Sequence, residues 1–384
     1  MTIEALVGLI NLVEGMHRNA AGSPKRTPEA GPDGIGGRVY NSLRHVTRRV
    51  GGGLEVLLGR LGPLFGDQPS SPEREAVLAA LNGGLGDYLE ASGSPQAIRL
   101  RLRRAGQPLP MDRSALAAAV AHPGSRLVVL AHGLCMNDLQ WNRQGHDHGA
   151  ALERDLGCTA IYLHYNSGRH ISSNGREFAE ALEALVGAWP VPVAELAILG
   201  YSMGGLLTRS AWHYGTAAGH GWLRRVRKLV FLATPHAGAP LARASHWLEL
   251  ALGASTYTGP LARLTQGHSA GINDLRHACL LDEDWQGRDR LAPTGGLPKV
   301  LPLPEGVACY AMAATTGSQE GDLKDRLLGD GLVPLASALG RHADPARALR
   351  FPEARQWIGC SMNHLDLLGR LEAYGQLRQW LAED

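Results

Sequence analysis

The stretch of residues 196–205 limits what this chain can fold into more than any other stretch does. Four apolar residues run into Gly-x-Ser-x-Gly around Ser202, and a helical pattern follows at once. A buried strand that turns sharply into a helix has this pattern, with glycines where larger side chains would collide across the turn. The stretch therefore predicts a strand of a parallel sheet that presents the Ser202 hydroxyl at its carboxyl edge.

Predicted strands and helices alternate over the rest of this region. Strict alternation of apolar and basic residues over 98–103 predicts a half-buried edge strand. Short apolar runs predict further strands at 127–131, 160–163, 228–233, 308–312 and 356–359. A helix is expected to open at Asn174, because Glu177 stands three residues on in a capping pattern. The fold class predicted is α/β, with a mostly parallel sheet covered by helices on both faces.

A helical region of residues 1–95 is expected to precede a catalytic domain of residues 96–384. Apolar residues keep helical spacing over 3–13, 39–61 and 72–89, and a linker rich in Gly and Pro spans 19–36. Arginines accompany the apolar stripe of 39–61, which suits packing on the catalytic domain or lying on an anionic membrane. Both interpretations stay open, and residues 1–70 are the segment expected to make any peripheral membrane contact.

The composition bears on the partners and on the location of the protein. The 384 residues carry a formal net charge of +2, which predicts no nucleic-acid partner and sets no oligomeric state. The five cysteines are scattered, with no Cys-x-x-Cys pair, as in reduced thiols of a cytoplasmic protein. The first apolar run, residues 3–16, is too polar for a signal peptide or a membrane span. We expect a cytoplasmic protein that is at most peripheral to a membrane.

A loop that could stabilise an oxyanion follows the strand at 127–131. His132 and Gly133 end that strand, and the glycine lets the chain pass over Ser202. The backbone N–H of Leu134 and that of Met203, directly after the serine, are the two donors expected to face a developing oxyanion. The His132 side chain is expected to hold this loop rather than to act as a base.

An acid and a base are expected to follow the serine in the order Ser, Asp or Glu, His. Asp330 stands between two glycines in residues 329–334, which suits a fixed loop above the sheet. His364 comes just after the last predicted strand and opens the final helical segment. The rival acids, which fit ordinary surface charges, are Asp322, Asp325 and Asp344.

The remaining histidines are expected to have lesser roles. His236 precedes every plausible acid, so it fits a residue that shapes the pocket or holds structure. Gly168 and His170 follow a strand end and are expected to line the substrate cleft. The pairs His146 with His148 and His164 with His170 lack the spacing of a zinc site, so we expect no metal and no cofactor.

Taken together, these residues resemble the α/β-hydrolase superfamily, and within it the lipase-like branch of GPI inositol-deacylases and bacterial triacylglycerol lipases. The stretches that carry the resemblance lie at residues 132–133, 200–205, 234–238, 330–334 and 363–364. The chain differs in having Ala233 where that branch often has glycine. The resemblance covers residues from about 125 onward, and it implies that the insertion of about 239–305 forms a cap over the active site.

The resulting hypothesis is a serine carboxylic-ester hydrolase that acts on acyl esters, in particular those of lipids. Ser202 would attack the acyl carbonyl, His364 would accept and return the proton, and Asp330 would hold the imidazole tautomer. Two alternatives remain: an acyltransferase that uses the same three residues, and a lipid-binding hydrolase fold without catalysis.

Overall fold

The computed structural model describes residues 71–239, 269–287, 298–319 and 329–383. Nearly all of them belong to one unit, Pro72–Asp384, which is the part considered below. The helix expected over 72–89 is present as α3 (Pro72–Ala91). The other N-terminal predictions, two helices and a linker, lie outside the described residues, and the division of the chain near residue 95 stays a prediction.

The strands of the described residues form one sheet in the order β2-β1-β4-β3-β5-β6-β7-β8. Strand β1 pairs antiparallel with β2 and β4, and every other neighbouring pair is parallel. The bounds are β1 Arg101–Arg104, β2 Gln107–Pro108, β3 Arg126–Ala131, β4 Thr159–His164, β5 Glu195–Tyr201, β6 Val226–Leu232, β7 Ala308–Thr315 and β8 Gln356–Cys360. The predicted fold class, a mostly parallel sheet with helices, is therefore confirmed.

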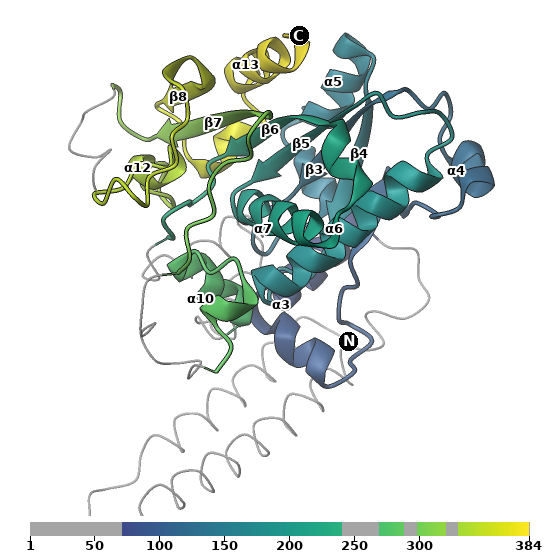
Figure 1. Ribbon diagram of the computed structural model, residues 1–384, viewed down its shortest axis with the longest axis horizontal. Coiled ribbons are helices and arrows are strands. Elements are labelled where there is room, and N and C mark those ends of the chain that lie inside the picture. Colours follow the sequence, from purple (N-terminus) through teal and green to yellow (C-terminus); the bar gives the residue numbers. More distant parts are fainter. Residues whose placement is uncertain (1–70, 240–268, 288–297, 320–328, 384) are drawn as a thin grey trace, which may run out of the picture. The chain divides into compact units, whose positions relative to one another are not determined.

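Helices cover both faces of this sheet. Figure 1 shows α6 and α7 on one face and α5 and α13 on the other. The helices are α4 Arg113–Ala119, α5 His148–Leu156, α6 Ile171–Ala188, α7 Met203–Ala218, α10 Ala270–His277, α12 Leu335–Ala338 and α13 Leu371–Ala382. Short 3-10 turns are η2 Asp138–Trp141, η3 Gly221–Arg225, η5 Asp282–Asp284, η6 Glu353–Arg355 and η7 His364–Leu368.

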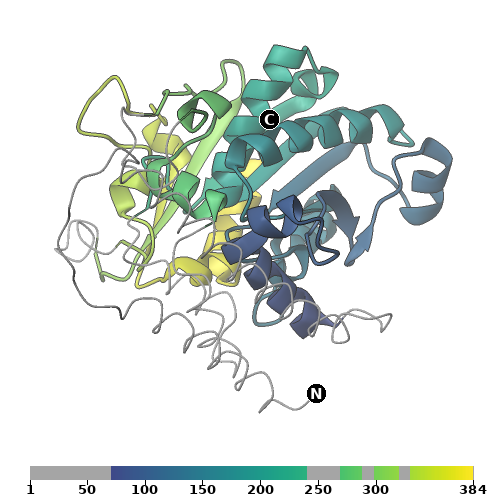
Figure 2. The same ribbon diagram turned by 90° about the horizontal axis from the view of Figure 1, so that it is seen from below.

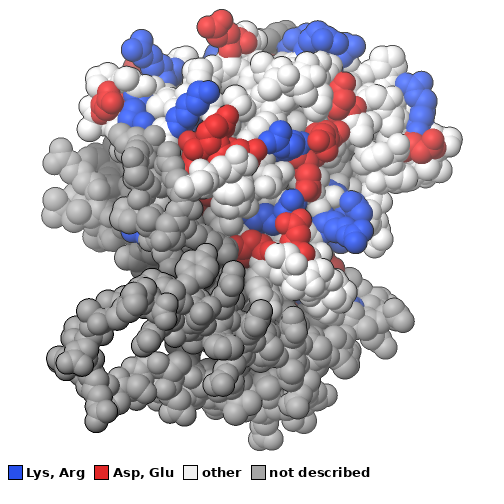
Figure 3. Space-filling model, turned by 60° about the horizontal axis from the view of Figure 1, so that its bottom comes forward, with Lys and Arg blue, Asp and Glu red and all other residues white. Residues whose placement is uncertain are grey.

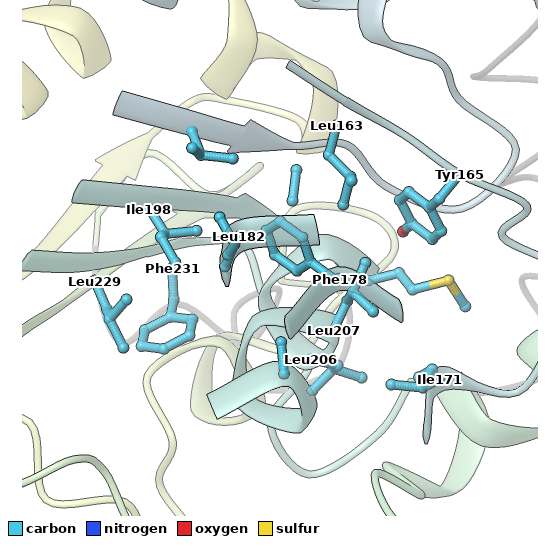
Figure 4. Close-up of a cluster of buried hydrophobic side chains, with 14 of the residues drawn as sticks. Leu163, Tyr165, Ile171, Phe178, Leu182, Ile198, Leu206, Leu207, Leu229 and Phe231 are labelled. Atoms are coloured by element: carbon cyan, nitrogen blue, oxygen red, sulfur yellow. The ribbon is translucent and has the colours of Figure 1, made fainter. Parts of the chain in front are cut away.

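Two hydrophobic cores hold the helices to the sheet, because successive side chains of a strand point to opposite faces. Val129 and Ile198 belong to the core shared with α6 and α7, part of which Figure 4 shows around Phe178. Val128 belongs to the other core, which contains Trp380 of α13. Burying one large apolar side chain contributes about 1.5–3 kcal/mol, so both cores stabilise the packing of the helices on the sheet.

The start of α6 differs from the sequence prediction. The helix begins at Ile171 rather than after Asn174, and the Asn174 side chain donates to the carbonyl of Asn166 at 2.8 Å. The N–H of Ile171 is instead satisfied by a carboxylate oxygen of Asp274, at 2.8 Å. Asp274 lies on α10, more than a hundred residues further along, so local sequence could not reveal this cap.

The insertion predicted over about 239–305 is described only in part. Its described segments contain α10 and η5, and α10 lies beside α3 (Figures 1 and 2). The Ser269 hydroxyl donates to the carbonyl of Gly83 at 2.7 Å, and the N–H of Ala270 donates to Asp87 at 2.9 Å. The remainder lies outside the described residues, and its role as a cap stays a prediction.

The surface carries charges of both signs. On the face drawn in Figure 3, basic and acidic side chains of the described residues are interspersed.

Within the segments that the structure describes, no helix has both the length and the apolar character needed to cross a bilayer.

Candidate active site

The sharp turn from strand to helix that the sequence predicts is present at Ser202. Strand β5 ends at Tyr201, α7 begins at Met203, and Ser202 between them has φ 55° and ψ −121°. A non-glycine residue in such a sparsely populated conformation costs of the order of 1–3 kcal/mol, so the surrounding structure must hold it. The Ser202 N–H donates to the carbonyl of Leu232 at 2.7 Å, which fixes the turn to the end of β6.

Glycines around the serine permit close backbone contacts. A Cβ on Gly200 would lie 2.5 Å from the Cα of Gly205, across the turn. A Cβ on Gly204 would overlap the carbonyl oxygen of Ala131, the last residue of β3. Any larger side chain at these positions would therefore push the turn and the end of β3 apart.

The loop of residues 132–136, named here the oxyanion loop, lies directly against the serine. A Cβ on Gly133 would lie 3.2 Å from the Cβ of Ser202 and 3.2 Å from the ring of Tyr201. Leu134 follows on this loop, and Met203 opens α7, whose N-terminal dipole favours negative charge. Two residues are predicted to supply oxyanion donors. Met203 directly follows Ser202, and Leu134 directly follows Gly133, which packs against Ser202.

Asp330 and His364 form a buried pair. The Nδ1–H of His364 donates to Oδ2 of Asp330 at 2.6 Å, and their side chains are 1% and 0% exposed. The other carboxylate oxygen accepts the N–H groups of Leu332 and Val333 at 2.9 and 2.8 Å. The carboxylate is therefore fixed, and it selects the imidazole tautomer in which Nε2 carries no proton.

The rival acids do not take this position. Asp344 is exposed, and its carboxylate accepts the N–H of Ala346 within its own turn. Asp322 and Asp325 lie outside the described residues.

The pair lies beside the serine turn. The ring of Tyr201, the residue before Ser202, has its centroid 4.9 Å from that of His364. The Tyr201 hydroxyl donates to the backbone carbonyl of His364 at 3.1 Å. Ser202 is buried, and its Oγ has no hydrogen-bond partner among the described residues. The structure therefore gathers the three predicted triad residues at one end of the sheet.

His132 holds the oxyanion loop from inside the protein. Its Nδ1–H donates to the carbonyl of Gly133 at 2.9 Å, and its Nε2 accepts the N–H of Tyr165 at 3.4 Å. Its ring stacks on that of Tyr165, with centroids 4.4 Å apart. Burial lowers the pKa of His132 to about 3, so the imidazole is neutral and suits one donor and one acceptor bond.

His236 lies in a buried polar contact with α7. A guanidinium nitrogen of Arg209 lies 3.4 Å from Nδ1 of His236, and another donates to the carbonyl of Leu301 at 2.5 Å. Burial, together with the nearby Arg209 charge, lowers the pKa of His236 well below its ordinary value. This neutral histidine thus connects α7 to the loop after β6, and its predicted part in shaping the pocket stays a prediction.

Gly168 and His170 contact other elements than the serine turn. Gly168 packs on α3, where a Cβ would lie 2.7 Å from the backbone nitrogen of Gly86. His170 lies 3.0 Å from the carboxylate of Asp274 and stacks on Trp285, with ring centroids 3.7 Å apart. Both residues connect the loop after β4 to neighbouring segments, and their contact with substrate stays a prediction.

Two of the other histidines, His146 and His148, lie near η7, and His164 lies near Asp138; the expectation of no metal stays a prediction. The Nε2–H of His148 donates to the carbonyl of Leu367 in η7, at 2.8 Å, and His148 Nδ1 lies 2.9 Å from Nε2 of His146. His164 Nδ1 lies 3.1 Å from Asp138. Among the residues that the structure describes, no three His, Cys, Asp or Glu side chains are grouped to hold a metal ion.

Sequence reasoning missed the residues that support the oxyanion loop from behind. The N–H of Cys135 donates to the hydroxyl of Ser167 at 3.0 Å, and Gly83 of α3 packs on Cys135. Glycines inside the helical pattern of 72–89 indicate close packing, and they are the only local feature of the sequence that could have indicated the contact between α3 and Cys135.

The chain matches one family model and is similar to several solved structures. Residues 105–275 match a family model described as a domain of unknown function (DUF7379). No curated protein matches the chain. Among solved structures, the chain is similar to the Bacillus licheniformis lipase BlEst2 in mature form, with 16% identity, a TM-score of 0.43, and coverage of 73% of this chain and 98% of that one.

Two further solved structures are similar at the same level. One is the Aspergillus fumigatus lipase B, with 14% identity, a TM-score of 0.39, and coverage of 73% of this chain and 62% of that one. The other is a Pyrobaculum calidifontis esterase, with 14% identity, a TM-score of 0.38, and coverage of 85% and 96%. At these scores the similarities do not establish the fold. The strand order and the serine turn of this chain do so, and they give an α/β-hydrolase-like fold.

Proposed function

We propose that this protein is a serine-dependent carboxylic-ester hydrolase. The observation that carries the proposal is the buried Asp330–His364 pair beside the strained Ser202 turn. A serine hydroxyl is a weak nucleophile unless a neighbouring base accepts its proton. The tautomer that Asp330 selects leaves His364 Nε2 as that base.

The reaction would proceed through an acyl-enzyme. Ser202 Oγ attacks the ester carbonyl carbon while its proton passes to His364 Nε2, and the N–H groups of Leu134 and Met203 donate to the oxyanion. The His364 imidazolium then protonates the leaving alcohol as the C–O bond breaks. Water repeats the sequence on the acyl-enzyme, which releases the carboxylic acid and restores Ser202.

We infer further that the acyl group is long and apolar. Support comes from the length of the insertion at 239–305 and from the resemblance of the motifs to the lipase-like branch. An insertion at this point can cover an apolar chain and exclude water from the reaction. Transfer to an alcohol instead of water would use the same residues, and an added acceptor alcohol would distinguish it by its ester product.

The test is a series of p-nitrophenyl esters from acetate to palmitate, with and without detergent micelles, on wild type and Ser202→Ala. We expect turnover that rises with chain length, and a loss of about 10⁴–10⁶ in kcat for the variant. Fastest turnover of the acetate would contradict the long acyl group. If kcat of Ser202→Ala stays within about tenfold of the wild-type value, Ser202 is not the nucleophile.

A further inference from the structure

Helix α3 is not part of the sheet, yet it touches the loop that faces the nucleophile. Its interior contains Gly83, although glycine is among the least favourable residues in a helix. A Cβ on Gly83 would overlap Sγ of Cys135 and would lie 3.0 Å from the Cα of Cys135. Cys135 directly follows Leu134 and has a positive φ of 59°. Glycine at position 83 therefore sets how closely α3 approaches the oxyanion loop.

A second contact fixes the other side of the same loop. The N–H of Cys135 donates to the Ser167 hydroxyl at 3.0 Å. The next residue, Gly168, lies against α3, where a Cβ would be 3.1 Å from the carbonyl oxygen of Gly83 and 2.7 Å from the nitrogen of Gly86. The oxyanion loop, the loop after β4 and α3 are thus packed on one another with no room for an added methyl group.

Buried charges fix α3 relative to the end of the oxyanion loop. Arg103 of β1 lies 3.1 Å from Glu75 of α3 and 3.0 Å from Asp138, which opens η2 just after the loop. The three side chains are 14%, 10% and 2% exposed. Removing one partner of such a buried network would leave an uncompensated charge, so the three side chains constrain one another's positions.

We propose that α3 is a positioning element for the oxyanion hole and that Gly83 is its key residue. The helix sets the position of Cys135 and, through it, the direction of the Leu134 N–H. This inference rests on the proposed function, because the hole acts only when Ser202 attacks a carbonyl. Oxyanion contacts form in the transition state, so a displaced donor lowers kcat and leaves KM nearly unchanged.

The test uses full-length Gly83→Ala and a rescue variant. We expect Gly83→Ala to lower kcat by at least about tenfold, and by no more than the about 10²–10³ that complete loss of one oxyanion donor costs. KM should stay within about twofold. Adding Cys135→Gly should restore most of the lost kcat, because it removes Sγ and Cβ and suits the positive φ. The control is Gly187→Ala on α6, where a Cβ meets nothing within 4 Å.

A second variant covers the case in which Gly83→Ala does not fold. Ser167→Ala removes the acceptor of the Cys135 N–H without altering α3, and we expect the same loss of kcat at unchanged KM. If the wild type is active and Gly83→Ala has the same kcat, this inference alone is overturned. The same holds if Gly83→Ala is unfolded and Ser167→Ala has the wild-type kcat. A loss that Cys135→Gly does not reverse also overturns it. A wild type that hydrolyses no ester overturns the proposed function and this inference together.

Discussion

The imidazole of His364 donates from Nδ1 to the carboxylate of Asp330 at 2.6 Å, with neither side chain more than 1% exposed. The same two residues are joined through the backbone, because the N–H of His364 donates to the carbonyl of Asp330 at 2.9 Å. The backbone hydrogen bond fixes the two chain segments relative to each other, and the Nδ1 hydrogen bond orients the ring. The pair is thus held in one orientation before any substrate binds, which is what a general base requires.

The first prediction concerns the acid of this pair. Asp330→Asn keeps an oxygen that can accept the N–H groups of Leu332 and Val333, so the loop should fold as before. The new amide donates to the ring and favours the wrong tautomer, a change that in a serine protease costs about 10⁴ in kcat. Steady-state kinetics on a p-nitrophenyl ester should show a loss of that order. The exposed Asp344→Asn serves as the control, and an equal loss there would mean that Asp330 has no special role.

The second prediction concerns the glycine of the oxyanion loop. A methyl group at Gly133 would lie 3.2 Å from Ser202 and from the Tyr201 ring, tighter than ordinary packing. Small misplacements in an active site can cost about 10²-fold, so Gly133→Ala should lower kcat by about 10- to 100-fold. The backbone at Gly133 tolerates alanine, because this glycine is not among those with positive φ, so thermal unfolding should show only the modest destabilisation of a crowded methyl group, about 1–3 kcal/mol. Wild-type kcat in Gly133→Ala would show that this glycine is not close to the reacting atoms.

The third prediction concerns acid stability. Burial lowers the pKa of His132 to about 3 from 6.5, so the folded protein keeps this ring neutral while the unfolded chain takes up a proton below pH 6.5. The free energy of unfolding should therefore fall as pH drops from 6.5 towards 3. One such group contributes up to about 1.4 kcal/mol per pH unit.

Urea unfolding of wild type and His132→Gln across this pH range measures the effect. The variant should be less stable at pH 7 and should lose less stability on acidification. The exposed His342→Gln serves as the control for replacing a histidine by glutamine. Parallel curves for wild type and His132→Gln would contradict a neutral, buried His132.

Sequence patterns predicted the central strands and the triad candidates for clear reasons. Strands β3 to β7 contain short apolar runs, which is the pattern expected of strands buried on both faces of a sheet. The Ser202 turn, Asp330 and His364 each carry a local signature of glycines or of a strand end. Strand β2, with two residues, and α4, with seven, are too short to leave a pattern.

What the sequence did not predict depends on contacts between distant residues. Asp274 caps α6, and Ser167 and Gly83 support Cys135, although these pairs are separated by many residues along the chain. Periodicity and capping rules use only residues that are close together in the sequence, so they cannot identify such partners. The support of the oxyanion loop therefore required the three-dimensional structure.

The most direct measurement of the central claim is mass spectrometry after labelling with a fluorophosphonate probe. The probe reacts with serines that a base activates, and peptide mapping identifies the residue that carries the adduct. We predict one adduct on Ser202 in the wild type, none in Ser202→Ala, and much slower labelling in Asp330→Asn. A wild type that stays unlabelled, or an adduct on a serine other than Ser202, would contradict a Ser202–His364–Asp330 esterase.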